Sequence, residues 1–146
     1  RVHMDALDDP FAAVDRALND CPLGDVADAV VVDMHCEATS EKMAMGHFCD
    51  GRATLVVGTH SHVPTADAQV LPGGTAYLTD AGFTGPHDSV LGRRVEPVIQ
   101  RFRTNLPQRF DVATDRVLLQ GALIEIDPAT GHARSIRRVS ESLPGA

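Results

Sequence analysis

Two short apolar runs separated by a helical segment constrain the fold of this chain most strongly. Residues 29–34 (Ala-Val-Val-Val-Asp-Met) and residues 53–57 are almost continuously apolar. Strands that are buried on both faces have this pattern. Between them, residues 43–49 are expected to form a short helix ended by an Asp-Gly pair. A strand, a helix and a strand within about 30 residues predict a βαβ unit with two neighbouring parallel strands.

The other segments fit the same α/β class, with strands that are antiparallel toward the C-terminus. Pro10 follows a capping aspartate and precedes apolar residues at helical spacing, which predicts a helix there. Further along, the sequence predicts a hairpin around the turn at 72–74, an irregular glycine-rich loop at 80–92, a helix at 96–104, and late strands joined by a turn at 127–131.

Composition sets the class of protein. With 146 residues and 43% hydrophobic content, residues 1–146 are expected to form a single domain with a core of its own. The net charge is −7 and basic residues do not cluster with aromatic ones, so a nucleic-acid duplex is not an expected partner. An apolar run of about 20 residues is missing, so no membrane association is expected. The three cysteines do not have the spacing of a disulfide framework or of a cysteine-rich zinc module. Together these features favour a cytoplasmic protein.

Histidines follow both predicted parallel strands. His35 comes after the first, and His60 and His62 come after the second, in the sequence Gly-Thr-His-Ser-His. Ligands bind outside the carboxyl ends of parallel strands, so three imidazoles are expected at one sheet edge. In extended chain His60 and His62 would project their rings the same way, and Gly58 would let the backbone turn sharply toward a ligand. Three imidazoles suit zinc, iron or manganese, although solvated loop histidines remain the alternative.

Several residues near these histidines are weaker candidates. Asp33 lies on the same strand face as His35 and could orient its imidazole, or be merely solvated. Asp80 follows a predicted strand and could support a ligand histidine. Thr39, with the two residues after it, could contact substrate, but capping of the next helix is the favoured interpretation. His87 lies in the glycine-rich loop, which could close over the site. Cys36, beside a candidate ligand, is interpreted as a core residue.

Three sequence blocks resemble a known enzyme family. VDMHCEATSEKMAMG, VVGTHSHVPTAD and GGTAYLTDAGFTGPHDSVLG are similar to signature blocks of the calcineurin-like metallophosphoesterases, and more closely of the YmdB-like bacterial branch, whose members are dinuclear phosphodiesterases acting on cyclic nucleotides. The likeness extends over nearly the whole chain. Amidohydrolase barrels also carry H-x-H after a strand, but too few residues follow His62 for a barrel of roughly 250 residues.

The resemblance implies a metal site and a substrate class. His35 and His60 would bind one metal ion and His62 the other, with iron or manganese favoured and zinc as a further candidate. The expected fold is part of a four-layer α/β sandwich with two mixed sheets, and the expected substrate is a small phosphodiester. Two ions of this kind activate a bridging hydroxide and neutralise the charge that develops on phosphate.

The family's remaining motifs have no matching block here. They are of the D-x-x-G, E-N and G-N-H kinds, and they carry an aspartate, a bridging acidic residue, an asparagine and the proton-donating histidine. The chain is therefore expected to be the C-terminal half of such a domain, weak in metal binding and inactive alone. It is expected to pair with a complementary N-terminal fragment or with a second copy. A catalytically silent metal- or phosphate-binding regulatory module is the alternative function.

Overall fold

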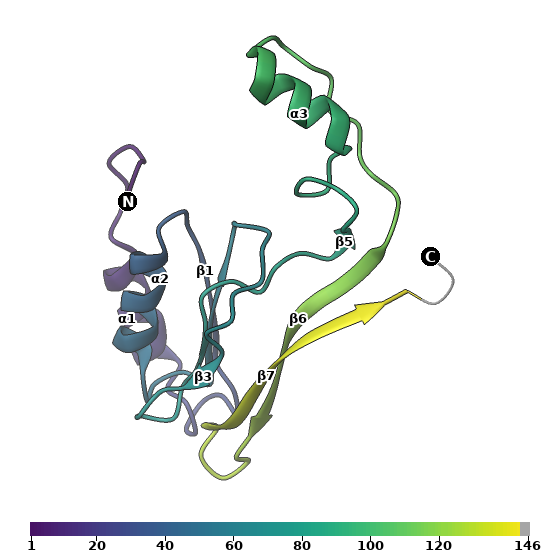
Figure 1. The fold of residues 1–146 in the computed structure, drawn as a ribbon. Coiled ribbons are helices and arrows are strands. Elements are labelled where there is room, and N and C mark those ends of the chain that lie inside the picture. The colour runs from purple at the N-terminus through teal and green to yellow at the C-terminus, as the bar shows by residue number, and fades with distance from the viewer. Residues whose placement is uncertain (144–146) are drawn as a thin grey trace.

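The computed structural model describes residues 1–143, which form two sheets and three helices (Figure 1). The mixed sheet has the strand order β1-β2-β4-β3, and the second sheet has the order β5-β6-β7. The helices are α1 (Pro10–Asp20), α2 (Thr39–Cys49) and α3 (Val95–Thr104). The strands are β1 (Val31–His35), β2 (Leu55–Thr59), β3 (Gln69–Val70), β4 (Ala76–Leu78), β5 (Gly85–Pro86), β6 (Val117–Ile126) and β7 (Ala133–Ser142).

The predicted βαβ unit is present. β1 and β2 pair in parallel, from Val31 opposite Leu55 to His35 opposite Thr59. β4 also runs parallel to β2, and β3 pairs antiparallel with β4 as the predicted hairpin. β6 and β7 form a long antiparallel ribbon that leads away from the mixed sheet toward α3 (Figure 1). The α/β class, the mixed sheet and the antiparallel later strands are therefore confirmed.

The core lies between the mixed sheet and the helices α1 and α2, which stand together on one side of that sheet (Figure 1). Met45 and Cys49 of α2 are almost fully buried against Val56 and Tyr77 of the strands. Cys36 is also buried, so its interpretation as a core residue is confirmed. Among residues 1–143, none of the helices has the length and apolar content needed to cross a membrane.

The prediction that both apolar runs are buried on two faces is wrong for β1. Val31 is 63% exposed, and Asp33 and His35 on the same face are exposed as well, while Met34 on the other face is buried. Successive side chains of a strand point to opposite faces, so this alternation marks a strand that is covered on one face only. β1 is also one of the two edge strands of its sheet, whereas β2, one position in, is mostly buried as expected.

The capping role expected of Thr39 is also wrong. The N-cap of α2 is Ala38, and no side-chain hydrogen bond caps the helix there. Thr39 is the first residue of the helix, one position too late for its hydroxyl to act as the cap.

Gly58 does not form the sharp turn that the sequence predicted. It lies within β2 and is not among the residues with left-handed φ. A Cβ at this position would lie 1.7 Å from the carbonyl oxygen of Thr79 and 2.6 Å from Cδ of Lys42. The missing side chain therefore lets β2 pack directly against the chain after β4 and against the Lys42 stem.

Gly58→Ala is expected to lower the free energy of unfolding by about 3 kcal/mol, because a backbone carbonyl must move to accept the methyl group. Gly121→Ala is the matched control. A Cβ at Gly121, in β6, has no atom within 4 Å, and the change should stay within about 1 kcal/mol. Urea denaturation of both variants measures the difference, and equal stabilities would contradict the packing role of Gly58.

Candidate metal site

The β1–β2 register brings two of the three candidate histidines together. His35 ends β1 directly opposite Thr59, which ends β2, and His60 is the next residue. His35 Nε2 and His60 Nδ1 are 3.2 Å apart. The two rings are nearly perpendicular, at 85°, with centroids 5.0 Å apart. Both side chains lie at the carboxyl edge of the parallel strands and are open to solvent.

The nitrogen of His35 that faces away from His60, Nδ1, which we call its outer nitrogen, bonds to the Thr59 hydroxyl. This hydroxyl in turn bonds to the Asp33 carboxylate. Thr59 Oγ1 lies 2.8 Å from Asp33 Oδ1, and since an ionised carboxylate only accepts, the hydroxyl donates to it. The hydroxyl has no second proton, so it accepts from His35 Nδ1 at 2.9 Å. His35 therefore carries a proton on Nδ1, and Asp33 contacts this imidazole through Thr59 rather than directly.

The outer nitrogen of His60, Nε2, which faces away from His35, bonds to the Glu37 carboxylate. His60 Nε2 lies 2.7 Å from Glu37 Oε2, so it donates a proton to that oxygen. A neutral imidazole has one N–H and one lone pair. In neutral form, the nitrogens of His35 and His60 that face each other are thus both bare lone pairs.

Two lone pairs 3.2 Å apart repel each other unless a cation lies between them. That cation is a proton, shared by a charged imidazole, or a metal ion. Imidazoles that bind a metal commonly donate their other N–H to a carboxylate, a hydroxyl or a carbonyl, as both rings do here. Two nitrogens that each lie about 2.1 Å from one ion are roughly 3 Å apart when they occupy neighbouring positions around it. The donor set of this pair therefore fits a metal ion.

His62 does not join the other two histidines. The extended backbone expected from His60 to His62 is wrong, because their φ angles are 110° and 63°. These left-handed values turn the chain between the two residues, so that the His62 ring faces Phe83, with centroids 5.7 Å apart. Within residues 1–143, no group of three or more His, Cys, Asp or Glu side chains is arranged to hold a metal ion.

Asp80 supports the histidine loop through its backbone rather than through an imidazole. Its Oδ2 accepts the Ser61 amide, between His60 and His62, at 2.9 Å, and also the Lys42 ammonium at 2.9 Å. Burial raises the pKa of the Asp80 carboxyl, but its bonds from Lys42 and from the Gly82 and Ser61 amides outweigh this effect and hold the pKa below its ordinary value.

His87 lies beside His62 rather than beside the His35–His60 pair. Its ring stacks on Phe83, with centroids 4.5 Å apart, and its Nδ1 donates to the carbonyl of Gly85 at 2.9 Å. Its Nε2 is buried and has no hydrogen-bond partner among residues 1–143. His62, Phe83 and His87 line a small cavity of about 180 Å³, and the rest of its lining comes from Val63, Pro64, Ser89 and Leu91.

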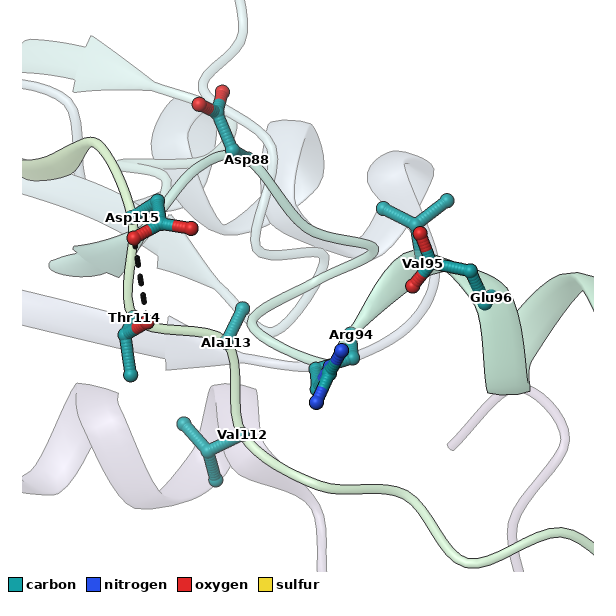
Figure 2. Close-up of a pocket in the computed structure, with 8 residues that line it drawn as sticks. All are labelled: Asp88, Arg94, Val95, Glu96, Val112, Ala113, Thr114 and Asp115. Atoms are coloured by element: carbon teal, nitrogen blue, oxygen red, sulfur yellow. Dashed lines mark hydrogen bonds between the residues drawn. The ribbon is translucent and has the colours of Figure 1, made fainter.

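A separate cavity of about 410 Å³ lies near the start of α3 (Figure 2). Acidic and basic side chains line it together, including Asp88, Arg94 and Asp115. Figure 2 shows the Thr114–Asp115 hydrogen bond on its wall. None of the candidate histidines lines this cavity. The chemistry of the donors, rather than the size of the hollow, points to the His35–His60 pair as the candidate site.

Three residues that hold the site were not identified from the sequence. Thr59 and Glu37 contact the histidine pair, and Lys42 contacts Asp80. Thr59 directly precedes the candidate ligand His60, and Glu37 follows the candidate ligand His35 by two residues. Their closeness in sequence to these histidines could therefore have identified both. Lys42 is the only lysine of the chain, but nothing in its sequence surroundings indicates burial.

Comparison with known proteins assigns this chain to one family. The model of the YmdB-like protein family matches residues 1–139. A 2′,3′-cyclic-nucleotide 2′-phosphodiesterase of Bacillus subtilis is 48% identical over 139 residues, which cover 95% of this chain and 52% of that protein. The chain belongs to the YmdB-like family.

Solved structures agree with this assignment. A hypothetical protein of Thermus thermophilus superposes with a TM-score of 0.86 at 44% identity, over 99% of this chain and 55% of that one. A Mycoplasma pneumoniae phosphatase superposes with a TM-score of 0.82 at 33% identity, over 92% of this chain and 47% of that one. The chain spans about half the length of the relatives it matches.

Thr59→Val tests the hydrogen-bond chain from Asp33 to His35. The isosteric change removes the hydroxyl that fixes the proton on His35 Nδ1, so a measurable population of the Nε2–H tautomer should appear. Nitrogen-15 NMR of the imidazoles at alkaline pH reports the tautomer. Thr114→Val, at an exposed threonine elsewhere, should leave His35 unchanged. An unaltered His35 tautomer in Thr59→Val would contradict the assignment.

Proposed function

We propose that this chain supplies the histidine side of the dinuclear metal site of a phosphodiesterase that hydrolyses cyclic nucleotides. The observation that carries the proposal is the His35–His60 pair, whose outer N–H groups are engaged and whose inner nitrogens face each other at 3.2 Å. Membership of the YmdB-like family and the names of its relatives support a phosphodiester as the substrate class.

In this proposal His35 and His60 hold one metal ion and His62 holds the other. Iron or manganese is favoured over zinc because the complete site would mix imidazole with oxygen ligands. When bound, such a pair of ions supplies a Lewis acid for the phosphate oxygens and a hydroxide nucleophile at neutral pH.

The chain's own residues prepare the imidazoles for this role. Thr59, itself bonded to Asp33, fixes the His35 proton on the outer nitrogen, and Glu37 does the same for His60. Hydrogen bonds of this kind orient the rings and raise the basicity of the nitrogens that bind metal. Their loss commonly lowers metal affinity by about 10- to 100-fold.

The acidic ligands and the proton donor are proposed to come from outside residues 1–146. β1 supports this part of the proposal, because it is an edge strand whose outer face is exposed at Val31 and Asp33. Exposed strand edges readily pair with further strands. A complementary N-terminal segment or a second copy of the chain would extend the sheet there and complete the site.

The small cavity beside His62 is the proposed place for the part of the substrate that is not phosphate. It adjoins a proposed metal ligand and is walled by Phe83, Val63 and Leu91. Apolar walls with a few polar groups are typical of small-molecule sites. A 2′,3′-cyclic nucleotide is the substrate that the name of the Bacillus subtilis relative favours.

Metal binding tests the proposal most simply. Titration calorimetry of the 146-residue chain with Mn²⁺ should detect weak binding that His35→Ala and His60→Ala each reduce by more than about tenfold. His47→Ala, at an exposed histidine of α2, is the control and should bind as the parent does. Equal affinities in all four proteins would show that the histidine pair is not the metal site.

Catalysis is tested separately with 2′,3′-cyclic AMP and Mn²⁺. The chain alone is expected to show no turnover above background, and turnover should appear when the N-terminal half of a YmdB-like relative is added. Metal-dependent turnover by the chain alone would contradict the proposal that its metal site is incomplete, but it would support the proposed phosphodiesterase activity. Metal binding without turnover in the reconstituted protein would instead favour a catalytically silent regulatory module.

A further inference from the structure

A buried ion pair lies directly beneath the histidine loop. Lys42 and Asp80 are 1% and 0% exposed, and Lys42 Nζ lies 2.9 Å from Asp80 Oδ2. Charged groups are rarely removed from water in this way, because desolvation opposes the attraction between them. Neither residue is among the proposed metal ligands, so the pair calls for an explanation of its own.

Asp80 bonds two loops as well as the lysine. The oxygen that accepts from Lys42 also accepts from the Ser61 amide at 2.9 Å, and the other oxygen accepts from the Gly82 amide at 3.0 Å. Ser61 is the middle residue of His60-Ser61-His62. One carboxylate therefore fixes the backbone between two proposed metal ligands.

The loop that it fixes is conformationally demanding. His60 has a φ of 110° and His62 a φ of 63°, both in the left-handed region that residues with a Cβ seldom adopt. Such conformations persist only where surrounding structure enforces them, and they concentrate at functional sites. The Ser61 amide bond to Asp80 holds the backbone at the residue between the two.

Lys42 keeps this acceptor ionised inside the protein. Without a cation beside it, a fully buried carboxylate would take up a proton or turn toward water, and its bond to the Ser61 amide would weaken. The sequence makes room for the lysine, since a Cβ at Gly58 would lie 2.6 Å from Lys42 Cδ. The glycine of Gly-Thr-His-Ser-His thus allows the ammonium to reach Asp80.

We infer that Lys42 and Asp80 are positioning residues, which hold the His60-Ser61-His62 backbone in the shape that directs the two imidazoles to different places. The inference rests on the proposed metal-binding role of these histidines. It also gives α2 a part in shaping the site, because α2 carries Lys42 and directly follows the segment that carries His35 and Glu37.

Amide hydrogen exchange of the 146-residue chain tests the inference without any metal. In Lys42→Met the Ser61 amide should exchange about tenfold faster or more, as expected for the loss of one charge-assisted hydrogen bond. The His60 and His62 ring signals should shift with it. Met45→Ala is the matched control, since Met45 is equally buried in the same helix. It should loosen the core amides while leaving the Ser61 amide and both rings as in the parent.

The double variant Lys42→Met/Asp80→Asn covers the case in which the single variant does not fold. It buries no unpaired charge, so it should fold, but its neutral amide is a weaker acceptor than a carboxylate. Faster Ser61 exchange than in the parent is expected here too. Parent-like exchange and ring signals, in the double variant or in a folded Lys42→Met, would overturn the inference.

Mn²⁺ titration of the same proteins separates the inference from the proposed function. Lys42→Met and the double variant should bind Mn²⁺ about tenfold more weakly than the parent, and Met45→Ala should bind equally. If the parent binds no Mn²⁺, the proposed function fails and exchange alone decides the inference. If the parent and Lys42→Met bind Mn²⁺ equally, the inference is wrong while the proposed function stands.

Discussion

The contact between His35 and His60 is the interaction on which the account depends. It exists because β1 and β2 pair in a register that sets His35 opposite Thr59, which brings the next residue, His60, alongside. Thr59 and Glu37 then hold the outer nitrogens, and the inner nitrogens are left facing each other. Two lone pairs in that position need a proton or a metal ion between them, and the proposed function places a metal ion there.

The parts of the molecule around this contact differ in how firmly they are held. β2 and β4 lie in the core, and Gly58 allows β2 to sit close to Lys42 and to the chain that follows β4. β1 is an edge strand and has one exposed face. The site thus combines a buried side, which contains the ion pair of Lys42 and Asp80, with an exposed side where a further element is proposed to dock.

The pattern of apolar runs and turns was enough to predict the fold class. The βαβ unit, the hairpin and the late antiparallel ribbon all follow from periodicity and turn residues. Exposure of Val31 could not be predicted, because an apolar run indicates a strand but does not reveal whether other elements cover both of its faces. The prediction for Thr39 was wrong by one position, because Thr39 is the first residue of α2 rather than its N-cap. Sequence patterns rarely locate the end of a helix to a single residue.

The ends of the predicted strands located the candidate histidines, but their arrangement depends on backbone angles that the sequence does not reveal. Gly-Thr-His-Ser-His suggested two rings on one side, whereas the left-handed φ angles of His60 and His62 separate them. Lys42 was unremarkable in sequence because burial of a lysine depends on an acidic partner 38 residues away. The most direct test of the account is nitrogen-15 NMR of the imidazoles during titration with diamagnetic Zn²⁺. The account predicts shifts at His35 Nε2 and His60 Nδ1, with protons retained on the outer nitrogens; shifts confined to the outer nitrogens, or none at either ring, would contradict it.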